Sequence, residues 1–156
     1  MNKNTALNIF YADDDEDDRF LFKSAISEIK TAITLSCFTS GFNLEKALFE
    51  NDYDCELVFL DLNMPGESGL QTLDSLQNAI QTNNLKVVIF TTSADLQVVQ
   101  KTFGRNAVLF VQKPLNFNSL VATLQQIIDN RNLLTLPILF KDFQYHLTQW
   151  PTFTHL

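Results

Sequence analysis

The sequence predicts an α/β fold in which helices cover both faces of a parallel sheet. Two observations carry this prediction. Short apolar runs alternate five times with segments of helical apolar spacing, and 46% of the 156 residues are hydrophobic, enough for one buried core. Parallel neighbours need crossover connections, which are nearly always right-handed, so the alternation specifies a doubly wound sheet. We expect one domain at residues 1–130 and an extension at 131–156.

Five apolar runs are interpreted as strands, because each is short and stops at polar or turn-forming residues. They cover residues 7–12, 33–38, 57–60, 87–90 and 108–111. The third run is apolar at every position, which is typical of a central parallel strand buried on both faces.

Apolar residues three and four apart predict a helix after each strand. The predicted helices cover residues 19–29, 42–49, a segment from 69 that closes at 82–84, 96–103 and 119–128. We expect Gly104 to end the fourth of these helices as a C-terminal glycine.

Charge and cysteine content narrow the function classes. The net charge is -7, from 18 acidic and 11 basic side chains, which disfavours direct contact with nucleic acid or an anionic membrane and favours a protein or cation partner. Cys37 and Cys55 lack metal-ligand spacing, so neither a zinc site nor a disulfide framework is expected. Because we see neither a signal peptide nor a membrane span, we expect a cytoplasmic protein without a membrane partner.

Polar residues follow four of the strands at the point where each one ends. Asp13 and Asp14 follow the first, Asp61 the third, Thr91 the fourth and Lys113 the fifth. In a flavodoxin-like strand order, 2-1-3-4-5, the first and third strands flank the topological switch point, where open α/β sheets keep their ligand chemistry. We therefore expect these side chains to converge.

Two more local explanations of the acids stay open. An Asp that follows a strand, as Asp61 does before Pro65 and Gly66, can simply cap a turn. Asp17 and Asp18 fit the N-terminus of a helix, where the helix dipole favours carboxylates.

Three carboxylates in one crevice need a compensating cation. Mg²⁺ suits such a site, because it binds one or two carboxylates, retains waters and accepts phosphate oxygens. Asp61 could then act as a nucleophile that becomes an aspartyl phosphate. A threonine hydroxyl and a lysine ammonium are suitable groups for the phosphoryl oxygens.

Over residues 6–130 the chain resembles a response-regulator receiver domain of two-component signalling. The motifs that carry the resemblance are Ala12-Asp13-Asp14-Asp15, Leu60-Asp61-Leu62-Asn63-Met64-Pro65-Gly66, Phe90-Thr91-Thr92-Ser93 and Val111-Gln112-Lys113-Pro114. Each motif alone is weak, but four in this order and at compatible spacing are specific.

The resemblance implies a phosphoacceptor switch rather than an enzyme, with Mg²⁺ as cofactor. It implies these roles: phosphoacceptor Asp61; metal site Asp13, Asp14, Asp61 and the backbone carbonyl of Asn63, with Asp14 the more direct ligand; Lys113 for the phosphoryl group; switch residues Thr91 and Phe110. The expected partners are a sensor histidine kinase or phosphotransfer protein and a downstream protein.

The extension is too short for a separate DNA-binding or catalytic domain, so we expect a stand-alone receiver that acts by protein contact. It is nevertheless apolar, which predicts packing against its own domain, the alternative we favour, or a homodimer or partner surface. The residues concerned are Leu133, Leu134, Leu136, Ile138, Leu139, Phe140, Phe143, Tyr145, Leu147, Trp150 and Phe153.

Two other functions compete with the switch. One is a receiver-like docking module that is never phosphorylated, against which the intact acids and Lys113 count. The other is a Mg²⁺-dependent phosphohydrolase of the haloacid-dehalogenase type, which places a second acid two residues after the nucleophile. Here that position holds Asn63.

Overall fold

The computed structural model describes residues 5–50, 54–136 and 140–145. Its centre is a parallel five-stranded sheet in the order β2-β1-β3-β4-β5. The strands are β1 (Leu7–Ala12), β2 (Ile33–Phe38), β3 (Leu57–Leu60), β4 (Lys86–Thr91) and β5 (Leu109–Gln112). The predicted fold class and strand order are confirmed.

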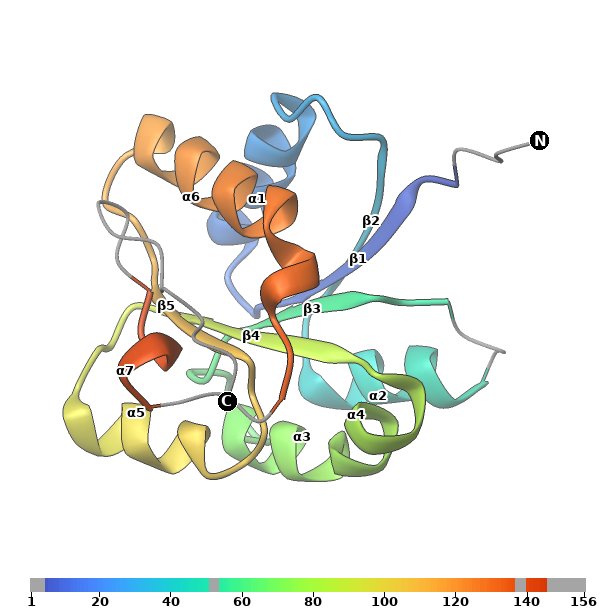
Figure 1. Cartoon of the computed structure of the whole chain (residues 1–156), viewed down its shortest axis with the longest axis vertical. Coiled ribbons are helices and arrows are strands. Elements are labelled where there is room, and N and C mark those ends of the chain that lie inside the picture. Colours follow the sequence, from blue (N-terminus) through green and yellow to red (C-terminus); the bar gives the residue numbers. More distant parts are fainter. Residues whose placement is uncertain (1–4, 51–53, 137–139, 146–156) are drawn as a thin grey trace.

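Helices lie on both faces of this sheet (Figure 1). They are α1 (Glu16–Ser27), α2 (Gly41–Glu50), α3 (Gly69–Ser75), α4 (Gln77–Asn83), α5 (Leu96–Phe103), α6 (Phe117–Asp129) and α7 (Phe140–Phe143), with a 3₁₀ turn at Arg131–Leu133. α1 and α6 cover one face, and α2, α3, α4 and α5 cover the other. Each face of the sheet therefore has its own apolar core.

The first helix begins earlier than the apolar pattern predicts. Residues 19–29 were expected, whereas α1 spans Glu16–Ser27, because Asp15 caps it by accepting a hydrogen bond from the backbone N–H of Asp18 at 3.0 Å. Three acids of the run thus form the first turn of α1, where the helix dipole stabilises them.

The helix predicted from residue 69 to the stop at 82–84 is interrupted at Leu76, between α3 and α4. The Gln77 side chain donates to the Leu73 carbonyl at 3.0 Å, taking the acceptor that the Gln77 backbone N–H would use in a continuous helix. The same amide donates to the Arg105 carbonyl at 2.6 Å, so a distant segment fixes the interruption.

The prediction that Gly104 ends the helix at residue 103 is confirmed, because α5 ends at Phe103 and Gly104 is its C-cap. Gly104 has a right-handed φ of -68°, and the left-handed residue of this turn is Asn106, with a φ of 60°. The Asn106 side chain donates to that of Gln77 at 2.8 Å. This hydrogen bond stabilises the left-handed conformation of Asn106, so the turn needs no left-handed glycine.

The loop after β3 depends on two glycines. A Cβ on Gly69 would lie 2.5 Å from the Asp61 carbonyl oxygen, so only glycine lets α3 begin this close to the end of β3. Gly66, at a φ of +86°, makes the turn that precedes it. Together they place Asp61 at the carboxyl end of β3, where the strand ends meet the loops.

The described part of the C-terminal extension packs against its own domain. Phe143 is fully buried, with ring centroids 5.3 Å from Phe103 and 6.2 Å from Phe110. Gln144 forms a parallel bridge with Phe110, and the Tyr145 N–H donates to the Phe110 carbonyl at 2.8 Å. The extension thus lies along the outer edge of β5, as Figure 1 shows for α7.

Phe143 belongs to one apolar core and Tyr145 to the other, so the extension closes both cores at this edge. The predicted apolar residues Ile138, Leu139, Leu147, Trp150 and Phe153 lie outside the described residues. The division into residues 1–130 and 131–156 stays a prediction.

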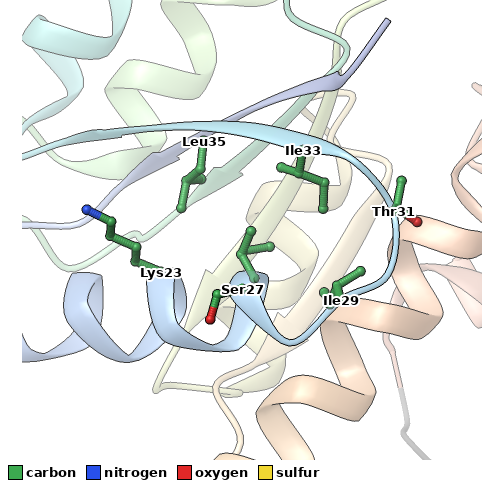
Figure 2. Close-up of a pocket in the computed structure, with 7 residues that line it drawn as sticks. Lys23, Ser27, Ile29, Thr31, Ile33 and Leu35 are labelled. Carbon is green, nitrogen blue, oxygen red and sulfur yellow. The ribbon is translucent and has the colours of Figure 1, made fainter. Parts of the chain in front are cut away.

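The opposite edge of the sheet is more open. A shallow groove of about 400 Å³ runs between α1 and β2, lined by Lys23, Ile26, Ser27, Ile29, Thr31, Ile33 and Leu35 (Figure 2). No helix in the described part of the chain is long and apolar enough to cross a membrane.

Candidate functional site

Asp61 lies just beyond β3, where the strand gives way to the glycine-containing loop. Its side chain is buried, its Oδ1 accepts the Asn63 N–H at 3.2 Å, and its Oδ2 accepts the Lys113 ammonium at 3.3 Å. Burial raises the pKa of Asp61, and the charge of Asp13 adds to this, while Lys113, the Asn63 N–H and the Thr91 hydroxyl oppose it. The charge of this carboxylate is therefore only partly compensated.

Asp13 lies next to Asp61 at the end of β1 and is fully buried. Its Oδ2 accepts the Tyr11 hydroxyl at 2.5 Å and the Lys113 ammonium at 2.6 Å, and its Oδ1 accepts the Asp15 N–H at 3.0 Å. Burial, followed by the charge of Asp13, raises the pKa of Tyr11 and keeps it a hydrogen-bond donor. These three contacts hold the Asp13 carboxylate in one position beside Asp61.

Asp14 completes the acid pocket, and it differs from Asp13 in being exposed. One oxygen each from Asp13, Asp14 and Asp61 lies within 4.8 Å of the others. The Asp14 carboxylate makes no hydrogen bond or ion pair with any other residue that the structure describes. Three hard carboxylate oxygens, one with free lone pairs and access to water, fit the preferences of Mg²⁺.

Lys113 reaches the acids from the loop after β5. Its ammonium also pairs with Asp18 at 2.7 Å, so it bridges three carboxylates. Burial would lower the pKa of Lys113, but the hydrogen bonds to Asp13 and Asp18 and the charge of Asp61 outweigh burial and raise it. Lys113 is therefore a permanent cation beside Asp61.

Thr91 and Phe110 occupy different surroundings. Thr91, at the end of β4, is fully buried, and its hydroxyl accepts a hydrogen bond from the Asn63 side chain at 3.2 Å, while Thr92 is exposed. Phe110 is also fully buried, but its neighbours include Phe143 of the extension. Thr91 thus faces the acids, whereas Phe110 connects β5 with the C-terminal segment.

The structure brings together the three acids predicted for the metal site, Asp13, Asp14 and Asp61, with Lys113 and Thr91. It adds two residues that sequence reasoning did not assign to the site, Tyr11 and Asp18. Tyr11 stands two positions before Asp13, and this spacing places both on one side of an extended chain. Asp18 was interpreted only as an acid of the helix N-terminus; its contact with Lys113 joins residues 95 positions apart.

Comparisons with known proteins agree with this geometry. The family model for the response regulator receiver domain matches residues 9–125. Among curated relatives, the glycerol metabolism activator of Pseudomonas putida is 34% identical over 117 residues, covering 72% of this chain and 52% of that protein. The transcriptional regulatory protein MalR of Bacillus subtilis is 28% identical over 111 residues, covering 71% and 46%. The chain spans about half the length of these relatives.

Solved structures show the same fold. A response regulator receiver domain from Rhodospirillum rubrum superposes with a TM-score of 0.71 at 25% identity, covering 84% of this chain and 97% of that one. The phosphorylated cyanobacterial phytochrome response regulator RcpA superposes with a TM-score of 0.73 at 19% identity, covering 81% and 94%. With its fold, its acid pocket and this match, the chain belongs to the response-regulator receiver domain family.

Proposed function

We propose that the protein is a phosphoacceptor switch in which Asp61 takes a phosphoryl group and the signal passes on by protein contact. The observation that carries this proposal is the bridge from the Lys113 ammonium to both Asp61 and Asp13 at the carboxyl edge of the sheet. A carboxylate nucleophile, a fixed cation and a buried hydroxyl, that of Thr91, are the groups that phosphoryl transfer requires.

The expected donor, which the protein would meet in the cytoplasm, is a phosphohistidine on a sensor histidine kinase or phosphotransfer protein. An Asp61 oxygen forms a bond to phosphorus while the bond from phosphorus to the imidazole nitrogen breaks. That nitrogen keeps the electron pair and takes up a proton. Lys113 would offer a positive charge to the phosphoryl oxygens, and the buried Thr91 hydroxyl, which is close enough to Asp61 to lower its pKa, would donate to one of them.

Asp14 and Asp61, with the Asn63 carbonyl, would hold Mg²⁺, and Asp13 would support the site from behind. When bound, the ion neutralises negative charge on the transferring group. Among the structural neighbours is an Mn²⁺-bound form of response regulator Rcp1, which agrees with a divalent ion in this fold.

Phosphorylation adds charge beside Thr91, and its effect would reach the surface through Thr91 and Phe110. The downstream partner is a protein in this proposal, because the net charge of -7 disfavours direct contact with nucleic acid. Sedimentation of the phosphorylated and unphosphorylated forms would tell whether that partner is a second copy of the chain.

Intact-protein mass spectrometry after incubation with acetyl phosphate tests the proposal. The wild type should gain one phosphoryl group in the presence of Mg²⁺, and Asp61→Asn should gain none. Circular dichroism checks that both proteins are folded. No gain in the folded wild type would overturn the proposal in favour of a docking module. Continuous release of inorganic phosphate over many turnovers would instead indicate a phosphohydrolase.

A further inference from the structure

The Asp13 carboxylate already accepts hydrogen bonds at both of its oxygens. Its Oδ2 accepts the Tyr11 hydroxyl at 2.5 Å and the Lys113 ammonium at 2.6 Å, and its Oδ1 accepts the Asp15 N–H at 3.0 Å. An ionised carboxylate offers about four lone-pair sites, so these donors leave Asp13 about one site for a metal ion. Asp13 is also 0% exposed, which keeps it from turning toward water.

The other two carboxylates of the pocket are less engaged. The contacts of Asp61 with the Asn63 N–H and the Lys113 ammonium are longer, at 3.2 and 3.3 Å. Asp14 is exposed, and its carboxylate accepts no hydrogen bond from the other residues that the structure describes. The pocket therefore offers a cation two available carboxylates, those of Asp14 and Asp61, and a third that donors already occupy.

Tyr11 is the donor to Asp13 whose side chain is fixed by packing. Its ring is 0% exposed, stacks on Phe22 at a centroid distance of 4.0 Å and meets the ring of Phe90 edge-on at 6.0 Å. Burial raises the pKa of Tyr11, so the hydroxyl stays a donor. Because the ring cannot turn away, the hydroxyl holds Oδ2 of Asp13 toward the apolar core that α1 covers.

We infer that Tyr11 is a positioning residue that keeps Asp13 from direct contact with the metal ion, so that the pocket binds Mg²⁺ in preference to Ca²⁺. This inference rests on the metal site of the proposed function. It assigns a task to a residue outside the Asp13, Asp14 and Asp61 group.

The two ions differ in the number of protein oxygens that they take. Mg²⁺ retains several waters and is bound by one or two carboxylates, whereas Ca²⁺ takes about six to eight oxygen ligands in a flexible arrangement. A third carboxylate that is free to turn toward the ion therefore favours Ca²⁺ more than Mg²⁺. With the Tyr11 hydroxyl in place, Asp14 and Asp61 supply the number of carboxylates that suits Mg²⁺.

A matched pair of variants tests the inference. Tyr11→Phe removes the hydroxyl from Asp13 but keeps the ring that stacks on Phe22. Tyr145→Phe also removes one tyrosine hydroxyl, but this one donates to the Gln126 side chain, at 2.6 Å, rather than to an acid of the pocket. A difference between the two variants therefore reports the contact with Asp13.

The measurement is calorimetric titration of the full, unphosphorylated chain with magnesium chloride and, separately, with calcium chloride. In Tyr11→Phe the ratio of the Ca²⁺ affinity to the Mg²⁺ affinity should rise roughly tenfold, the size of effect that hydrogen-bond partners of metal ligands commonly have. In Tyr145→Phe the ratio should equal that of the wild type. Circular dichroism checks that each protein is folded.

A second pair of variants shows whether Tyr11 acts through Asp13. Asp13→Asn removes the carboxylate that the hydroxyl is inferred to hold. In the Asp13→Asn protein, the further change Tyr11→Phe should leave the affinity ratio where it was. An equal rise of the ratio with and without the Asp13 carboxylate would overturn the inference, because Tyr11 would then act through another group.

A ratio in folded Tyr11→Phe that equals the wild-type ratio, or that shifts toward Mg²⁺, would also overturn the inference. So would a folded wild type that binds neither ion. A wild type that binds Mg²⁺ but gains no phosphoryl group from acetyl phosphate would overturn the proposed function instead, while the titrations would still decide the role of Tyr11.

Discussion

Two clusters of side chains contact β5. One is held together by polar contacts between charged groups and the other by apolar packing. At its carboxyl end, Lys113 gathers Asp13, Asp18 and Asp61 by short polar contacts. Within the strand, Phe110 packs with Phe103 and Phe143 by apolar burial. We refer to these as the acid cluster and the aromatic cluster.

The difference shows how one strand can serve both chemistry and stability. The acid cluster concentrates buried negative charge, which raises the pKa of Asp61 through burial and works against the folded state. The aromatic cluster removes apolar surface from water and stabilises the fold. Substitutions in the two clusters should therefore change the free energy of unfolding in different ways.

The largest loss is expected from Phe143→Ala in the aromatic cluster. Phe143 is 0% exposed, so its removal leaves a cavity and should lower the free energy of unfolding by about 3 to 4 kcal/mol in urea titration. The matched control is Phe140→Ala in the same helix, where the side chain is 41% exposed and its ring lies 5.2 Å from that of Phe103, so the loss should be smaller, about 1 to 2 kcal/mol. Equal losses would mean that the extension does not pack on β5.

Tyr11→Phe should show that the acid cluster also contains stabilising contacts. The variant keeps the ring stacked on Phe22, at a centroid distance of 4.0 Å, but removes the hydroxyl that donates to Asp13. Because the acceptor is a buried carboxylate, the expected loss is about 2 kcal/mol. Chemical denaturation measures it, and a loss no larger than that of Tyr145→Phe would contradict it.

Asp61→Asn should have the opposite sign and stabilise the metal-free protein at neutral pH. The raised pKa means that the fold favours the protonated carboxyl, so stability is lost as the pH rises through the folded pKa. A neutral amide should restore about 1 kcal/mol, or about 3 °C in Tm. The gain should vanish in acid, below the ordinary pKa of an aspartate, where the wild-type carboxyl is also neutral.

Mg²⁺ sharpens this prediction, because it should raise the Tm of the wild type more than that of Asp61→Asn. A metal-free Asp61→Asn protein that melts below the wild type at neutral pH would show that Lys113 fully compensates the carboxylate.

The smallest effect is expected from Tyr145→Phe, in the part of the extension that belongs to the core on the other face of the sheet. Its hydroxyl donates to the Gln126 side chain at 2.6 Å, near the surface of α6, and its loss should cost about 0.5 to 1 kcal/mol. Urea titration beside Tyr11→Phe gives the direct comparison. A loss near about 2 kcal/mol would contradict this and would mean that the hydroxyl belongs to a buried network of hydrogen bonds beneath the extension.

The strands were predictable from sequence to within one residue, because buried parallel strands are uninterrupted apolar runs. The start of α1 was not, since an acid run is equally compatible with a loop and a first helical turn. The interruption at Leu76 depends on the contact between Gln77 and Arg105, which no local pattern contains.

The acids, Thr91 and Lys113 could be brought together from sequence because strand ends in a parallel sheet share one edge. Asp18 could not, because its contact with Lys113 depends on how α1 places the third carboxylate of its first turn relative to the loop after β5. For the extension, composition predicted burial, but the bridge from Gln144 to Phe110 required the structure.

That bridge also bears on how the protein avoids unwanted assembly. An edge strand with unpaired backbone groups is a template for pairing with another chain, and natural proteins cover or blunt such edges. At β5 the Tyr145 N–H donates to the Phe110 carbonyl, so the extension covers part of the outer edge of this strand. β2 has no described strand on its outer side and is flanked by the groove of Figure 2. Removal of the extension would expose the backbone groups at the outer edge of β5 that Gln144 and Tyr145 now cover.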